Sequence, residues 1–238
     1  MTSDRFADTD SPVLDVLAAR WSPRAYAADA SIDEAKLSSA LEAARWSPSA
    51  SNTQPWRFIV ARRGTTEHNT VHANLLGFNQ AWAGNAAVLI VAVTENEAAD
   101  GSALPWAAYD VGQAVAHLSV QAHHDGLHVH QMGGFDAAGL RAAFGLEARF
   151  SPVTVVALGA MGELETLPEA LQEREVAPRA RRPLAESLIV NDFNMEARLN
   201  YLSDIFRSNG VFMLEPSFFS QLLAVAMRVL QNRGVAEE

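Results

Sequence analysis

Three short runs of apolar, largely β-branched residues limit what this chain can fold into more than any other feature of its sequence. They are WRFIVA at 56–61, AVLIVAVT at 87–94 and VTVVAL at 153–158. Each run is short and bounded by turn-forming or charged residues, so all three are predicted to be buried β-strands. The chain is therefore expected to build a sheet from segments that lie far apart in the sequence.

Helical patterns separate these strands, and their ends carry capping signals. Ser11 and Pro12 suit the N-cap and first position of a helix, and Ser31 to Glu34 has the form of a capping box. The expected helices cover 11–20, 31–45, 107–124 and 136–144, and 168–183 is expected to be a polar, arginine-rich loop. Because helices and strands alternate too irregularly for strict βαβ winding, the core is predicted to be α+β or mixed α/β.

The chain changes character near residue 187, which suggests two parts with the bounds 1–186 and 187–238. The second part begins with a polar linker and carries two amphipathic helical patterns, at 195–206 and 216–233. Two such helices alone bury too little surface to be stable, so their apolar stripes need a partner. A membrane surface is one candidate, but the second helix offers only Arg228 and Arg233 as cations.

Composition narrows the functional classes. The formal net charge of −10 disfavours nucleic-acid binding, because phosphates would repel the chain. The absence of cysteine excludes disulfides, thiolate nucleophiles and thiolate metal sites. The polar first residues do not resemble a signal peptide, and the apolar stretch at 86–93 is too short to cross a membrane. We expect a cytoplasmic protein that binds neither nucleic acid nor membrane.

Four separate segments carry residues that could hold a ligand. They are 20–24 (RWSPR), 47–56 (SPSASNTQPW), 131–136 (QMGGFD) and 178–183 (PRARRP). The first could direct two guanidinium groups and a hydroxyl at an anion, and the adjacent glycines of the third let the backbone approach a planar ligand. Both also suit ordinary roles, as a helix end and a turn, and the second is a common kind of helix-to-strand loop. The fourth is the one basic cluster in an acidic chain and suits a phosphate.

In this order, the four segments resemble the nitroreductase family of FMN enzymes, and the most specific element is the string from Pro48 to Trp56. The resemblance implies a three-layer α/β/α sandwich around a central mixed, mainly antiparallel sheet. It also implies a homodimer with FMN sites at the subunit interface. The implied activity is an oxidoreductase that passes a hydride from NAD(P)H through flavin N5 to a small electron-poor acceptor, such as a nitroaromatic or a quinone.

The resemblance assigns residues to the FMN phosphate. Arg20 and Ser22 match positions at the phosphate end, with Trp21 between them. Arg179 and Arg181 match a pair of basic residues that contact the same phosphate. Charge-assisted hydrogen bonds of this kind are the strong ones in proteins.

Other matched positions surround the flavin ring. Arg24 matches the basic position near the pyrimidine, and Asn79 matches a polar position at the pyrimidine edge. The segment that reaches the flavin from the partner subunit is matched by Pro48, Ser49, Ala50 and Asn52, and the loop that approaches N5 is matched by Met132, Gly133 and Gly134. No protein side chain is expected to act as nucleophile, because the cofactor carries the chemistry.

The chain departs from the family pattern at two positions. Trp82 stands where some members have a lysine facing the pyrimidine, which leaves Arg24 to stabilise reduced flavin alone. Gly133 replaces a common acidic residue beside N5, which would alter substrate or nicotinamide preference. No glycine-rich dinucleotide motif follows a strand, so the nicotinamide is expected to visit the flavin in a ping-pong mechanism.

Alternatives stay open on the sequence alone. A flavin-binding module without turnover, a relative with divergent chemistry such as flavin fragmentation or reductive dehalogenation, and an unrelated acidic interaction protein are the rivals. Five histidines between 117 and 130 could bind a metal, but Gly126 interrupts the helix among them, and helix-end or interface roles are favoured. Because dimers of this family commonly wrap a C-terminal arm around each other, 187–238 is predicted to be a dimer arm.

Overall fold

The computed structural model describes residues 5–189, and the chain divides into two units, Met1–Ala180 and Arg181–Glu238. The described part of the second unit contains one short 3-10 helix, η4 (Leu184–Ser187). The helices predicted at 195–206 and 216–233 lie outside the described residues. The predicted boundary at residue 186 therefore stays a prediction, and the fold below is that of the first unit.

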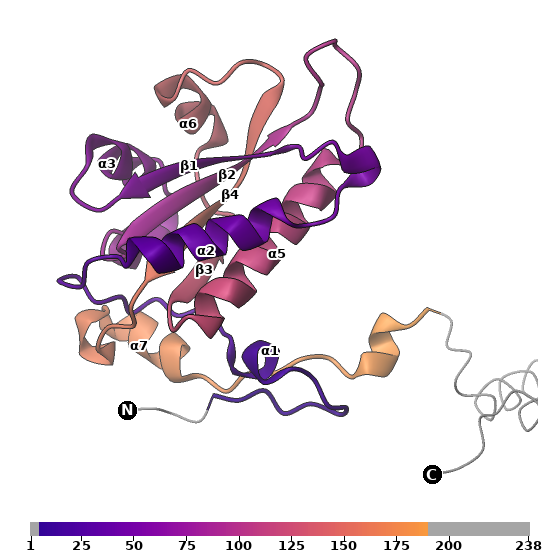
Figure 1. Ribbon diagram of the computed structural model, residues 1–238. Coiled ribbons are helices and arrows are strands. Elements are labelled where there is room, and N and C mark those ends of the chain that lie inside the picture. Colours follow the sequence, from indigo (N-terminus) through magenta and orange to yellow (C-terminus); the bar gives the residue numbers. More distant parts are fainter. Residues whose placement is uncertain (1–4, 190–238) are drawn as a thin grey trace, which may run out of the picture. The chain divides into compact units, whose positions relative to one another are not determined.

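A four-stranded antiparallel sheet forms the centre of the first unit (Figure 1). Its strands are β1 (Trp56–Arg62), β2 (Val88–Glu95), β3 (His128–Met132) and β4 (Phe150–Gly159), in the order β1-β2-β4-β3. The three strands predicted from the apolar runs are confirmed as β1, β2 and β4. The edge strand β3 was not predicted, because its histidines and glutamine give it no apolar run.

Helices cover both faces of the sheet, which confirms the α+β class and the three-layer sandwich. On one face lie α2 (Glu34–Arg45) and α5 (Ala107–His124), which pack against each other (Figure 1). On the other lie α3 (Thr66–Ala73), α4 (Gln80–Ala83) and α6 (Ala137–Ala143). Because both faces are covered, every residue of β2 is buried and successive residues enter two separate cores.

The caps explain where several helices begin and end. The prediction for 107–124 is confirmed by α5, after which Gly126 takes a φ of 80°, and Asp136 caps α6 by accepting a hydrogen bond from the Gly139 N–H. The capping box at Ser31 was wrong, because the Asp33 carboxylate instead accepts hydrogen bonds from the Ala35 and Lys36 N–H groups in the first turn of α2.

Two other predictions were wrong. Instead of starting at Ser11, α1 covers only Asp15–Ala19, and its N-cap is Leu14. The segment predicted as a loop at 168–183 contains α7 (Glu169–Val176), which buried Leu171 anchors to the core. Single-turn 3-10 helices complete the unit: η1 (Ala50–Asn52), η2 (Gly77–Asn79) and η3 (Leu164–Thr166). Between residues 5 and 189, no helix is long and apolar enough to span a membrane.

Candidate functional site

The Arg20–Arg24 segment leaves α1 in an extended conformation and is held along its main chain. Arg20 caps α1 with a ψ of 130°, which ends the helix. The guanidinium of Arg179 donates hydrogen bonds to the carbonyl oxygens of Ala18 (2.6 Å), Arg20 (2.9 Å) and Arg5. Two residues that the sequence assigned to one phosphate, 159 positions apart, are thus neighbours in space.

After Arg24, the main chain of this segment forms hydrogen bonds with the residues that follow β4. The Ala27 N–H donates to the Ala160 carbonyl at 3.1 Å, and the Gly162 N–H donates to the Ala25 carbonyl at 2.9 Å. A Cβ at Gly162 would lie 2.5 Å from the Tyr26 carbonyl carbon, so this close pairing requires glycine. Glu175 of α7 closes the arrangement by accepting hydrogen bonds from the Arg24 and Ala25 N–H groups.

Strand β3, which leads into the Met132–Gly134 loop, contacts the Arg20–Arg24 segment. His130 Nδ1 donates to the Pro23 carbonyl at 2.9 Å, and the His130 ring lies 4.6 Å from the Trp82 ring. Trp82, which stands where some family members have a lysine, is buried between His130 and Tyr26 and belongs to the core. Trp56 is buried as well and belongs to the other core cluster.

Asn79 and the Gly133-Gly134 loop meet directly. The Gly134 carbonyl accepts hydrogen bonds from the Leu76 N–H at 2.9 Å and from Asn79 Nδ2 at 3.1 Å. A Cβ at Gly134 would lie 2.9 Å from that amide nitrogen, whereas a Cβ at Gly133 would meet no atom within 4 Å. The loop is therefore closed on the Asn79 side and open beside Gly133.

Two histidines at and just after the C-terminal end of α5 have lowered pKa values. Burial lowers the pKa of His123, and the charges of Arg20 and Arg179 lower it further. Burial, with the nearby His123 ring, lowers the pKa of His128 to about 4. Arg179 and Arg20 are also neighbours, because the Arg179 guanidinium donates to the Arg20 carbonyl. Such a group of cations suits an anionic ligand.

The Ser47–Gln54 segment lies at the other end of α5. Ser47 Oγ is 2.7 Å from His117 Nδ1, and the Ala50 N–H donates to Asp110 Oδ2 at 3.1 Å. Ser51, Asn52 and Gln54 have φ angles of 51°, 55° and 50°, a left-handed conformation that costs about 1–2 kcal/mol for an ordinary L-residue. Strain of this kind persists where surrounding contacts impose it, and it often marks a binding segment.

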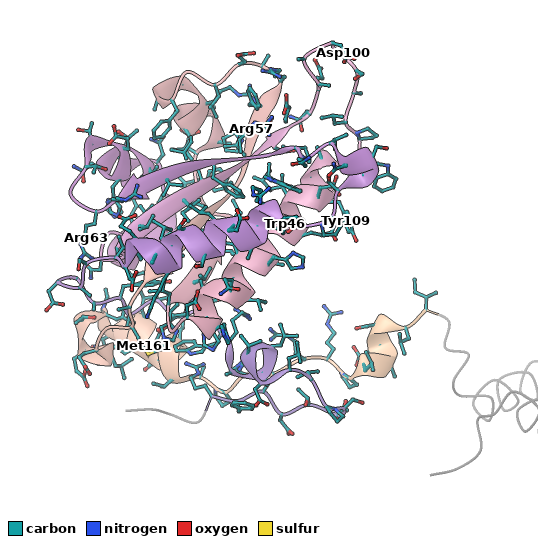
Figure 2. The ribbon with its side chains drawn as sticks, viewed as in Figure 1. Trp46, Arg57, Arg63, Asp100, Tyr109 and Met161 are labelled. Carbon is teal, nitrogen blue, oxygen red and sulfur yellow. The ribbon has the colours of Figure 1, made fainter. Side chains whose placement is uncertain are left out.

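A cavity of about 240 Å³ adjoins this segment, between η1 and the start of α5. Its wall includes Ser51, the buried Asp110 and Trp106, whose side chain is 63% exposed. Figure 2 shows Tyr109 on α5 and Trp46 at the end of α2, and both aromatic side chains are also exposed. This end of the helical layer therefore presents large apolar groups beside a strained, polar segment.

One chain does not bring all the predicted site residues together. Gln131, next to the glycine loop, donates to Ser119 Oγ, and Ser119 lies nine residues beyond Asp110 on α5. At the helical rise this separation is about 13 Å. Within residues 5–189, no hydrogen bond joins Ser49–Asn52 to Asn79 or to Met132–Gly134. Arg181 belongs to the second unit.

Sequence reasoning missed two buried acidic residues that hold the candidate segments in place. Asp110 is 2% exposed and Glu175 is 4% exposed, and each accepts hydrogen bonds from a segment that the sequence did single out. Asp110 gave no distinct signal, because an acidic residue in the first turn of a helix ordinarily stabilises the helix dipole. Glu175 gave none, since its segment was predicted as a loop. Among the described residues, no group of three potential ligands could hold a metal ion.

Comparisons with known proteins identify relatives along most of the chain. A family model described as the nitroreductase family matches residues 17–74 and 62–160. An uncharacterised 15.4 kDa protein of Mycolicibacterium smegmatis is 39% identical over 137 residues, 55% of this chain and 92% of that protein. A solved structure of an oxidoreductase containing FMN is 32% identical with a TM-score of 0.74, and the match covers 82% of this chain and 98% of that one. A structure from Desulfovibrio desulfuricans, described as a nitroreductase in complex with FMN, is 27% identical with a TM-score of 0.63, over 78% and 99% of the two chains.

Proposed function

The chain belongs to the nitroreductase family, and we propose that it is an FMN-dependent oxidoreductase that passes a hydride from NAD(P)H to a small electron-poor acceptor. The observation that carries the proposal is that Asn79 contacts the glycine loop at Gly134, while β3, which leads into that loop, contacts the Arg20–Arg24 segment through His130 and Pro23. These segments come from distant parts of the sequence. The FMN of two similar solved structures supports the same cofactor here.

The residues present fit an FMN molecule. Arg20 and Arg179 are neighbours through the hydrogen bond from the Arg179 guanidinium to the Arg20 carbonyl, and two cations in one place suit its phosphate. The open space beside Gly133 leaves room for a planar ring to approach the backbone, and Asn79 holds the loop in place by its bond to Gly134. Arg24, 26% exposed at its side chain, offers a cation to the pyrimidine. We propose no separate role for Trp82, which is buried.

Bound FMN would supply hydride transfer at N5, and the chain's own residues would supply position and charge. Arg24 would favour the anionic reduced form electrostatically, because no other arginine or lysine of the chain is assigned to the pyrimidine. With no dinucleotide motif in the sequence, the nicotinamide and the acceptor would use one face in turn. Ping-pong kinetics follow, with parallel initial-rate lines.

We propose that the site is completed by a second copy of the chain. The Pro48–Asn52 segment, assigned to the flavin by resemblance, lies about 13 Å along α5 from the level of the glycine loop. A two-fold symmetric dimer would let this segment reach the site of its partner. The exposed Trp46, Trp106 and Tyr109 beside it provide apolar surface for such an interface.

We also propose that residues 187–238 form a dimer arm. The apolar stripe at 216–233, which includes Phe218, Leu222 and Leu230, is the reason, because a lone amphipathic helix needs a partner. Truncation after Glu186 should lower dimer stability and FMN retention together, measured by light scattering and flavin absorbance. A truncated protein that remains a yellow dimer of unchanged thermal stability would contradict the arm.

The absorbance spectrum of the purified protein is the first test of the function. We expect a flavin spectrum, release of intact FMN by acid or heat, bleaching by NADH or NADPH, and reoxidation by a quinone or a nitroarene. Released FAD, or protein without flavin after incubation with FMN, would overturn the proposal. Stable FMN without bleaching by either nicotinamide would instead indicate a flavin-binding module.

A further inference from the structure

Glu175 is an acidic side chain buried beside the candidate site, at 4% exposure near the end of α7. Its Oε1 accepts hydrogen bonds from the Arg24 N–H at 2.7 Å and from the Ala25 N–H at 3.1 Å. Its Oε2 lies 3.4 Å from Nη1 of Arg24. One carboxylate therefore contacts both the main chain and the guanidinium of the same residue.

Burial of a carboxylate is costly, so its retention calls for a compensating set of contacts. Leu171, one turn earlier on α7, already anchors this helix to the core, so the helix does not depend on Glu175 for apolar burial. The contacts of Glu175 are instead directed at Arg24 and Ala25. It also lines a cavity of about 350 Å³ together with Trp21 and Ala25.

We propose that Glu175 is a positioning residue for Arg24: it fixes the main chain at Arg24 and Ala25 and reduces the positive charge that Arg24 presents to the flavin. The second part of this proposal, the effect of Glu175 on the charge near the flavin, rests on the proposed function. Reduced flavin is favoured by nearby positive charge, so a paired Arg24 stabilises it less than an unpaired one. Glu175 thereby keeps the reduction potential lower than Arg24 alone would set it.

Glu175→Gln is the direct test, because it keeps an oxygen for the two N–H groups and removes the charge. At mildly alkaline pH we expect reduced FMN to bind about tenfold more tightly relative to oxidised FMN than in the wild type. For a two-electron couple this is an upward shift of about 30 mV in the midpoint potential, measured by spectroelectrochemistry. A potential equal to that of the wild type, or a lower one, would overturn the second half of the proposal.

Two controls separate this effect from a general change in charge. Glu163→Gln and Glu165→Gln remove exposed carboxylates that line the same cavity, and they should move the potential much less because water screens them. In an Arg24→Ala background, Glu175→Gln should also have little effect on the potential. A shift of equal size in that background would show that Glu175 does not act through Arg24.

Amide hydrogen exchange in the flavin-free protein tests the first half without any cofactor. The amides of Arg24 and Ala25 should exchange slowly in the wild type and at least tenfold faster in Glu175→Ala. Rapid exchange in the wild type would overturn the positioning role even if no variant folds. If the protein binds no FMN, the proposed function fails and the effect on potential fails with it, whereas the exchange rates still decide whether Glu175 positions the segment.

Discussion

The Arg20–Ala27 and Ser47–Gln54 segments are both assigned to the flavin, but the chain holds them in opposite ways. The first is fixed along its length by Arg179, His130, Glu175 and the end of β4, and it contains no residue with positive φ. The second is fixed at its base by Asp110 and His117, and three of its residues adopt left-handed conformations.

The difference suggests that each segment serves a different part of a shared site. A segment that its own chain holds on all sides is ready to bind before any partner arrives, which lowers the entropy cost of binding. A strained and exposed segment needs further contacts from another molecule. In the proposed dimer, the FMN site of the second copy provides these contacts.

Mixing two inactive variants is the strongest test of whether the two segments belong to a site shared between two copies of the chain. Arg20→Ala with Arg24→Ala damages only the first segment, and Ser49→Ala with Asn52→Ala damages only the second. If each site takes one segment from each copy, exchanging subunits between the two proteins rebuilds one intact site in every mixed dimer, so roughly a quarter of the wild-type activity returns. The assay is nicotinamide-dependent acceptor reduction before and after subunit exchange. No recovery after confirmed exchange would assign both segments to one chain's site.

The Arg20→Ala variant tests whether the first segment binds the phosphate. Loss of one charge-assisted hydrogen bond should weaken FMN binding by about ten- to a hundredfold and riboflavin binding much less, since riboflavin has no phosphate. Fluorescence titration measures both dissociation constants. Arg62→Ala is the matched control, because Arg62 is an exposed arginine that pairs with Glu34. Equal losses for FMN and riboflavin would show that Arg20 does not face the phosphate.

The free energy of unfolding should fall at acidic pH, because His128, in the strand that contacts the first segment, has a lowered pKa. The folded-state pKa of His128, about 4, lies below its ordinary value, so the unfolded chain binds more protons and stability falls as the pH drops from about 6.5 to about 4. After allowance for partial solvent screening, we expect His128 to account for about 2 kcal/mol of this loss. Denaturant unfolding across this range measures it. His128→Gln should flatten the slope, whereas Val129→Ala, next to it in β3, should lower stability equally at every pH.

Relief of strain in the second segment should give the smallest effect. Ser51→Gly removes the left-handed penalty but adds backbone entropy to the unfolded state, so the flavin-free protein should gain about 0.5 kcal/mol. Ser22→Gly in the first segment, where φ is not positive, should instead lose a similar amount. Thermal unfolding compares the two. A loss of stability in both variants would mean that the strain at Ser51 is compensated locally.

Local sequence signals predicted the elements whose causes are local. The apolar runs became β1, β2 and β4, and the caps at Asp125-Gly126 and Asp136 marked helix ends correctly. The same signals failed at α1, whose N-cap Leu14 makes no side-chain hydrogen bond, and at the start of α2, where Asp33 caps the helix in place of Ser31. They also missed β3 and α7, whose polar sequences each contribute few residues to the core, among them Val129 and Leu171.

The sequence by itself determined the α+β class, the acidic and cysteine-free character of the chain, and the polar strings that resemble the nitroreductase motifs. Only the tertiary structure decided which strings meet. The strand order β1-β2-β4-β3 brings Gly134 to Asn79 and the Arg20 carbonyl to Arg179, and it leaves Ala50 at the far end of α5 with Asp110. The physical reason is the separation in sequence over which each kind of interaction acts. Caps and apolar runs act between neighbours in the chain, whereas the Arg24–Glu175 contact spans 151 residues and exists only once the sheet has formed.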